Sequence, residues 1–510
     1  MASHLISPRD LILQFFCYFP DLSEKRERER EREREGRERE RELVLAAAWK
    51  GTNPRPSAKL RMQSPVARLT RCVPFVLSKS LVAKRAFPTP MTPLRVLSDT
   101  CQKVVGGGAS GQMQEWRLLL EKAESSPEIV NLTQGYPDFA GSATARREAA
   151  EAIAKDGPNK LNQYSPLVGL SSLMESLSKF YKRVWNMDVD AKREILVTTS
   201  GTEAISIALQ ALVSPGEEVV VFEPCFPWYL PVSRLAGGEV KLCKLSMEDE
   251  YAIDAGKLEA SFDPKKTKVI IVNSPHNPTG RVLSESDIET VHRFASTSEV
   301  GCVIFSDEAY EGQCWAKEGH VKIKVLVDKL NEKTGSKVRV VTMGTASKLC
   351  SLTGWRVGWL LGDEDIISGC KALHGYSTYC APSPLQHGIA KALDEFTDQS
   401  FDGTRDMMES NARKVVDALR GQGFNTYNPE GGYFVVADGS PLGFSSNMEL
   451  CQVLIDECKV AVAPMNMFYG TPAPELTPSE RGLVRIAICK TEPVIQEAIA
   501  RIRKLSPPPS

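Results

Sequence analysis

Residues 338–362 read VRVVTMGTASKLCSLTGWRVGWLLG, in which two apolar segments flank a polar one. The flanking segments are rich in β-branched and aromatic residues and have the length of buried strands. Similar segments recur toward the N-terminus with helical patterns between them: EILVTT (194–199), VVVFEP (219–224), KVIIVNSP (268–275) and GCVIFSDE (301–308). Apolar strands that alternate with amphipathic helices predict an α/β fold with a mainly parallel sheet flanked by helices.

A second region follows this alternation. Beyond about Asp363 we expect a long helical stretch that leads to a smaller α+β domain, with strand candidates GYFVVAD (432–438) and LVRIAIC (483–489). The expected parts of the chain are a leader over 1–110, an N-terminal segment over 111–162 that packs with the small domain, a large domain over 163–390 and the small domain over 391–510.

Composition excludes several classes of function. The 510 residues carry 63 basic and 64 acidic side chains, a net charge of −1, so no overall field attracts nucleic acid or an acidic membrane. No stretch reaches the roughly 18 consecutive apolar residues of a membrane span. The 13 cysteines include no Cys-x-x-Cys pair and the six histidines no His-Glu-x-x-His motif. We therefore expect reduced thiols, and no metal, nucleic acid or membrane as a partner.

The leader has its own composition. Residues 24–42 alternate Arg and Glu, which predicts a solvated helix or a disordered segment without a function of its own. Residues 43–98 contain ten Lys and Arg and no acidic residue, which fits either a transit peptide or an inert leader. The expected location is cytoplasmic or mitochondrial, with the transit segment within 62–98.

Polar side chains stand where the predicted strands end, at the edge where parallel sheets bind ligands. Lys348 and Arg356 follow VRVVTMG, and cationic neighbours favour an amine that forms a Schiff base. Asp307, with Tyr310 three residues on, could pair with a protonated pyridine nitrogen. Asn277 ends a further strand. SGTEA (200–204) opens a helix, with free N–H groups for a phosphate.

Each of these residues alone also fits a structural role: Lys348 a surface position, Asp307 a turn cap, Asn277 an Asx turn and the SGT segment a helix cap. Together they supply what one cofactor, pyridoxal 5′-phosphate (PLP), requires.

Three motifs in register, NSPHNPTG (273–280), SDEAYE (306–311) and SKLCSLTGWRVG (347–358), resemble the class I aminotransferases of PLP fold type I. The likeness runs from about Asn131 to the C-terminus. NLTQGYPDF (131–139), EGGYFVVAD (430–438) and VAPMNMFYG (462–470) are most similar to the kynurenine–oxoglutarate, glutamine and methionine transaminase group.

The resemblance implies a role for each matching residue. It makes Lys348 the residue that bonds the cofactor and then moves the substrate proton, and Asp307 the partner of the pyridinium nitrogen. Asn277 and Tyr310 would hold the phenolic oxygen. Phe226 would stack on the face of the cofactor ring. The phosphate would be bound by Gly201, Thr202, Thr345, Arg356 and, from a partner subunit, Tyr164.

The same resemblance implies a homodimer and a substrate site. Arg485 would clamp the substrate α-carboxylate, Gly135 would lend its backbone to it, and Tyr379 from the partner subunit would line the side-chain pocket. The chain departs from the kynurenine enzymes at two places: SGT (200–202) replaces a Gly-Ala-Tyr sequence, and Cys380 replaces a histidine. Kynurenine itself therefore fits less well than transamination in general.

The implied activity is PLP-dependent aminotransfer from an L-amino acid of the kynurenine, glutamine, methionine or aromatic type to a 2-oxo acid, by a ping-pong mechanism. Two alternatives stay open. A leaving group at the β-carbon would allow cysteine-S-conjugate β-lyase activity on the same fold. A non-catalytic PLP-fold protein would act through its leader, but such a protein predicts a damaged site.

Overall fold

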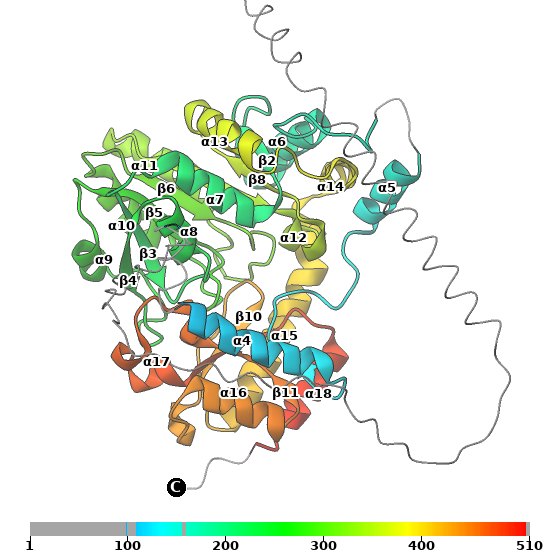
Figure 1. Cartoon of the computed structure of the whole chain (residues 1–510), viewed down its shortest axis with the longest axis vertical. Helices are drawn as coiled ribbons and strands as arrows, with labels where there is room; N and C mark the ends of the chain where they lie inside the picture. Colours follow the sequence, from blue (N-terminus) through cyan, green and yellow to red (C-terminus); the bar gives the residue numbers. More distant parts are fainter. Residues whose placement is uncertain (1–97, 99–108, 156–159, 506–510) are drawn as a thin grey trace, which may run out of the picture. The chain divides into compact units, whose positions relative to one another are not determined.

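The computed structural model describes Ser98, residues 109–155 and residues 160–505 (Figure 1). The chain divides into two units, 1–90 and 91–510, and everything described below belongs to the second. The Arg-Glu repeat and nearly all of the 43–98 segment lie outside the described residues. Within the described part, no helix is long and apolar enough to cross a membrane, and no group of three or more His, Cys, Asp or Glu could hold a metal.

A seven-stranded sheet has the order β2-β8-β7-β6-β5-β3-β4. All neighbours pair in parallel except β8, which runs antiparallel to both β2 and β7, so the predicted mainly parallel sheet is confirmed. Its strands are β2 (Ile195–Thr198), β3 (Glu218–Glu223), β4 (Glu239–Lys244), β5 (Thr267–Asn273), β6 (Val303–Asp307), β7 (Arg339–Thr345) and β8 (Gly358–Leu361).

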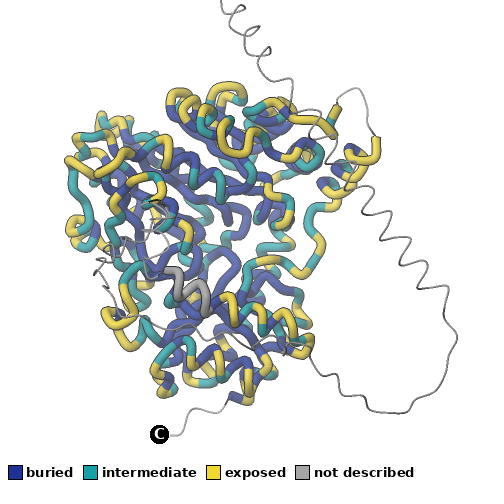
Figure 2. Tube along the Cα trace, in the orientation of Figure 1, coloured by how far each residue is buried: buried dark blue, intermediate teal, exposed yellow. Residues whose placement is uncertain are grey.

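Helices cover both faces of this sheet because every inner strand is apolar on both sides. In β3, Val219 and Val221 join one hydrophobic cluster, and Val220 and Phe222 join another. The buried residues accordingly run through the sheet, and the outer helices carry the exposed ones (Figure 2). The helices up to the second domain are α4 (Ala109–Ser125), α5 (Ala143–Ala154), α6 (Ser171–Trp185), α7 (Ser200–Leu212), α8 (Tyr229–Leu235), α9 (Ala255–Ser261), α10 (Glu285–Ser296), α11 (Ile323–Thr334) and α12 (Ala346–Leu349).

The long helical stretch expected beyond about Asp363 consists of three helices. It forms α13 (Glu364–Ser377), α14 (Ser383–Glu395) and α15 (Asp402–Gly421). The first break falls at Tyr379, whose φ is 70°, followed closely by Pro382, which begins the next helix. Proline disfavours a helical conformation in the residue before it, so α13 and α14 are separate helices.

The C-terminal region is built on a four-stranded antiparallel sheet of order β12-β13-β10-β9. Its strands are β9 (Asn425–Thr426), β10 (Phe434–Asp438), β12 (Ala463–Pro464) and β13 (Leu483–Ala487), and its helices are α16 (Asn447–Asp456), α17 (Pro478–Gly482) and α18 (Glu492–Ile502). A short parallel pair joins β1 (Val130–Asn131) to β11 (Val460–Ala461), so the N-terminal segment begins beside this region. Further on, α5 packs on α14.

Candidate active site

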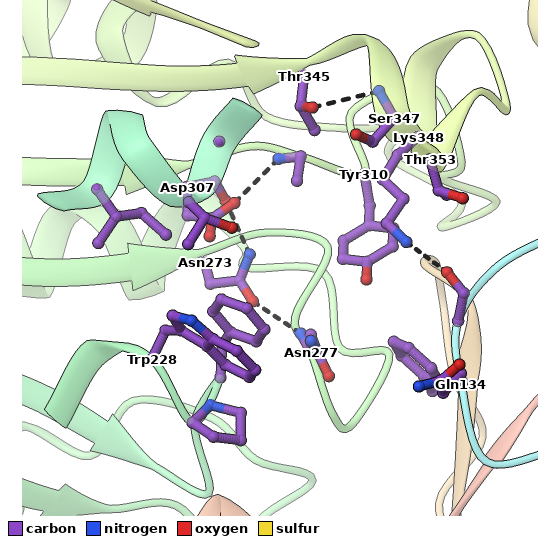
Figure 3. A pocket seen from close by; sticks show the side chains of 18 of the residues that line it. Gln134, Trp228, Asn273, Asn277, Asp307, Tyr310, Thr345, Ser347, Lys348 and Thr353 are labelled. Atoms are coloured by element: carbon purple, nitrogen blue, oxygen red, sulfur yellow. Dashed lines mark hydrogen bonds between the residues drawn. The ribbon is translucent and has the colours of Figure 1, made fainter. Parts of the chain in front are cut away.

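The carboxyl ends of the strands surround a cavity of about 290 Å³. Its walls come from the loops after β2, β3, β5, β6 and β7 and from β10, β13 and the 3-10 helix η4 (Met465–Phe468) (Figure 3). The sequence-predicted residues that line it are Gly135, Gly201, Thr202, Phe226, Asn277, Asp307, Tyr310, Thr345, Lys348, Arg356 and Arg485. Positions up to 350 residues apart thus meet at one site.

Two predicted residues do not line this cavity. Tyr164 is 83% exposed and Tyr379 is 49% exposed. Their rings form an edge-to-face pair with centroids 5.6 Å apart. Both are predicted to act at the site of a neighbouring subunit, and neither lines the cavity of its own chain.

Lys348 projects from α12, directly after β7, and its amine donates a hydrogen bond to the backbone oxygen of Gly135. Nζ lies 4.9 Å from the ring centroid of Tyr433 and 5.6 Å from that of Tyr310. The pKa of Lys348 is lowered to about 8, chiefly by burial of the amine, with Arg485 lowering it as well and Cys489 opposing the shift. About a tenth of the amine is therefore unprotonated at pH 7, far more than for an ordinary lysine, and this form can act as a nucleophile and proton carrier.

Asp307 ends β6 and is 5% exposed. Its carboxylate accepts hydrogen bonds from the Tyr229 hydroxyl (2.6 Å) and the Ala309 N–H (3.1 Å). Burial raises the pKa of Asp307 to about 6, while the hydrogen bond from Tyr229 lowers it. Among the described residues no cation pairs with this carboxylate.

Asn273 links the ends of β5 and β6. Its Nδ2 donates to the Asp307 backbone oxygen (2.9 Å) and its Oδ1 accepts from the Asn277 N–H (2.7 Å) (Figure 3). The Asn277 side chain is thereby held opposite Arg485. Tyr310 packs edge-on against Tyr433, with ring centroids 5.2 Å apart, and burial raises the pKa of its hydroxyl.

Arg485, in the middle of β13, is 7% exposed. Its guanidinium donates to Asn277 Oδ1 and to the Thr133 backbone oxygen, both at 2.9 Å, and its carbon lies 3.9 Å from the Phe434 ring centroid. Nε has no hydrogen-bond partner, and in the part of the chain that the structure describes no carboxylate pairs with the side chain. Burial lowers the pKa of Arg485 to about 10, which reflects the cost of an unpaired buried cation.

The start of α7 offers an anion site. Gly201 and Thr202 occupy its first turn, and Arg356 Nη2 donates to Thr202 Oγ1 across 3.4 Å. Thr345, at the end of β7, caps α12 and faces the same space. Free N–H groups at a helix start, together with a guanidinium, suit a phosphate.

Sequence reasoning missed several residues of the site. Tyr229 and Asn273 position Asp307, and Trp116 and Trp228 line the cavity. Tyr229 and Trp228 belong to EPCFPWY directly after a strand, so the rule that strand ends carry the ligand site points to them. Trp116 in α4 lies far ahead of the first predicted strand, EILVTT (194–199), so the strand-end rule does not point to it.

Comparison with known proteins gives one family. Residues 127–502 match the family model of class I and II aminotransferases. Methionine aminotransferase of Escherichia coli is 29% identical over 74% of this chain and 92% of its own length, and rat kynurenine–oxoglutarate transaminase 3 is 29% identical over 74% and 85%. The solved N-succinyldiaminopimelate aminotransferase of Mycobacterium tuberculosis covers 80% of this chain and 99% of its own, at 30% identity and a TM-score of 0.69.

The chain therefore belongs to the class I and II aminotransferases. It has the α/β fold of PLP fold type I that the sequence predicts, and it is an enzyme that moves an amino group from an amino acid to a 2-oxo acid.

Proposed function

We propose that this aminotransferase uses PLP and prefers amino donors with an apolar side chain. The observation that carries the proposal is the buried guanidinium of Arg485, which has no carboxylate partner among the described residues and lines the same cavity as the amine of Lys348. A buried cation is costly until a ligand supplies the opposite charge. The α-carboxylate of an amino acid supplies it as a bidentate pair.

The residues present fit the cofactor. A protonated pyridine nitrogen would give Asp307 the cation that it lacks, and the start of α7 with Arg356 would hold the phosphate. When bound, PLP supplies an aldehyde for the amine of Lys348 and a ring that withdraws electrons from the substrate α-carbon.

The chain's own residues then divide the work. Arg485 and Asn277 fix the donor carboxylate, which orients the α-carbon toward Lys348. The lysine amine, freed from its hydrogen bond to Gly135, would take the α-proton from the donor and deliver it to the aldehyde carbon of the cofactor, and with the 2-oxo acid it would carry a proton in the opposite direction. Asp307 stays ionised because Tyr229 and Ala309 donate to it, and it keeps the ring nitrogen protonated.

The side-chain end of the cavity supports an apolar donor. Trp116, Met467 and Phe468 form one hydrophobic cluster there. The charged residues that line the cavity are Asp307, Lys348, Arg356 and Arg485, each with a role above, so the described residues offer no further cation there for a second carboxylate. Methionine and phenylalanine fit such walls better than aspartate does.

We also propose a homodimer. Tyr164 and Tyr379 are exposed aromatic side chains outside their own cavity, and a partner subunit would bury them and receive them at its site.

The test is the visible absorbance of the purified holoenzyme while methionine, glutamine, phenylalanine, kynurenine, alanine and aspartate are added one at a time. We expect the band to fall with methionine or phenylalanine, to return with a 2-oxo acid, and not to respond in Lys348→Ala. A holoenzyme that responds to no donor contradicts the proposal. A response to aspartate alone contradicts the apolar preference.

A further inference from the structure

Glu223, the last residue of β3, is 0% exposed and contacts a loop that lies 247 positions further along the chain. Its carboxylate accepts hydrogen bonds from the N–H groups of Gly470 (2.9 Å) and Thr471 (3.1 Å) and from the Thr471 hydroxyl. A buried carboxylate is tolerated only where such donors satisfy it. The buried carboxylate of Glu223 therefore needs this loop in place for its hydrogen bonds, and these hydrogen bonds in turn hold the loop.

Two further contacts attach the loop to the large sheet. The Cys225 N–H donates to the Phe468 backbone oxygen across 2.7 Å. A Cβ on Gly470 would lie 2.9 Å from Leu242 of β4 and 3.0 Å from Leu230 of α8, so the loop backbone sits directly on these elements. The loop is thus attached to the large sheet by packing and several hydrogen bonds rather than by a single hydrogen bond.

The two segments that Glu223 joins are walls of the cavity. The tethered loop presents Met467 and Phe468, and the Phe468 ring centroid lies 4.5 Å from the guanidinium carbon of Arg485. The segment after Glu223 presents Phe226 and Trp228, whose rings stack with centroids 5.1 Å apart.

We infer that Glu223 is a positioning residue that holds the Met467–Phe468 wall against the segment that carries Phe226 and Trp228, and thereby sets the fit of a large donor side chain. The inference rests on the proposed function, since the donor side chain is taken to lie against the Met467–Phe468 wall. Glu223 does not line the cavity, so it acts through the loop.

Three variants separate this role from general stability. Glu223→Leu leaves the N–H groups of Gly470 and Thr471 without an acceptor. Glu223→Gln is the matched control, because its amide oxygen can accept both N–H groups while its amide nitrogen donates to the Thr471 hydroxyl. Thr471→Val removes only the hydroxyl contact and serves if Glu223→Leu does not fold.

We expect Glu223→Leu to raise the KM for methionine about tenfold, with kcat changed by less than about twofold, because the loop gains freedom but the reacting groups stay in place. The KM for alanine should change by less than about threefold, since a methyl group makes little contact with these walls. The KM of Glu223→Gln for methionine should equal that of the wild type. The KM of Thr471→Val for methionine should lie between those of the wild type and Glu223→Leu.

Hydrogen exchange of residues 465–471 in the cofactor-free protein gives a readout independent of activity. Exchange should be faster in Glu223→Leu and unchanged in Glu223→Gln. The inference is overturned if methionine and alanine are affected alike, if exchange does not change, or if exchange rises while the KM for methionine stays constant. Should the wild type react with no donor, the proposed function fails, and the exchange measurement still decides whether Glu223 holds the loop.

Discussion

At the scale of single residues, the site holds charged groups in a buried place without a matching partner. Within the described part of the chain, Arg485 has no carboxylate partner and Asp307 no cation. Burial raises the pKa of Asp307 and lowers that of Arg485, so it favours the neutral form of each. Burial likewise lowers the pKa of Lys348 to about 8. Such groups cost stability in the empty protein, and the ligands of the reaction would remove that cost.

Tyr229→Phe tests how the ionised state of Asp307 is maintained. The Tyr229 hydroxyl donates to the carboxylate and so favours its charged form, which lowers the pKa of Asp307. Without this hydrogen bond the pKa of Asp307 rises, so on acidification the carboxylate is protonated at a higher pH than in the wild type. We expect the acid limb of the pH profile of kcat/KM to move upward by about one pH unit or less.

The matched control is Tyr251→Phe, which removes a buried hydroxyl that has no hydrogen-bond partner among the described residues. Its acid limb should coincide with that of the wild type. A Tyr229→Phe profile that keeps the wild-type limb, or one that moves to lower pH, would argue against this account of Asp307.

At the scale of elements, the apolar strands were predictable because both their faces are buried, and each predicted segment contains a strand. The edge strand β4 was missed, since in EVKLCK (239–244) only Cys243 is buried and the pattern is not that of an inner strand. Strand ends pointed to the residues that line the cavity. The hydrogen bond between Tyr229 and Asp307 was not predictable, because it depends on β3, β5 and β6 lying in that order in the sheet.

Gly358→Ala tests the contact between β8 and the start of α7. A Cβ at Gly358, the first residue of β8, would lie 2.6 Å from the backbone nitrogen of Gly201. The first turn of α7 must then move, and the proposed phosphate site with it. We expect PLP to bind the cofactor-free variant about tenfold more weakly in equilibrium dialysis.

Gly362→Ala is the matched control, because Gly362 lies directly after the same strand. Its Cβ would meet its nearest neighbour at 3.4 Å, an ordinary contact, so PLP affinity should stay at the wild-type value. Equal affinities in the two variants would show that the start of α7 does not need the space that Gly358 leaves. Circular dichroism of both variants identifies any loss of fold.

At the scale of the whole molecule, the surface near α13 points to a second subunit. Tyr376 is 95% exposed and Tyr379 is 49% exposed, and the segment that carries them is fixed to α7 through Glu203. The Glu203 carboxylate accepts hydrogen bonds from the Thr378 hydroxyl (2.5 Å) and from His374 Nδ1 (2.9 Å). The exposed aromatic residues are therefore held rigidly to the helix that opens the phosphate site, as a shared site between subunits requires.

Subunit complementation decides whether Tyr164 serves its own chain or a partner. Lys348→Ala and Tyr164→Phe each impair every site of a homodimer. In a hybrid of the two variants, the chain that keeps Lys348 would receive an intact Tyr164 from its partner, so one native site re-forms. We expect differently tagged chains, co-expressed and purified through both tags, to have about half of the wild-type kcat/KM per dimer. If Tyr164 acted within its own chain, the hybrid would be no more active than the mean of the two parents. A monomeric protein would yield no material that carries both tags.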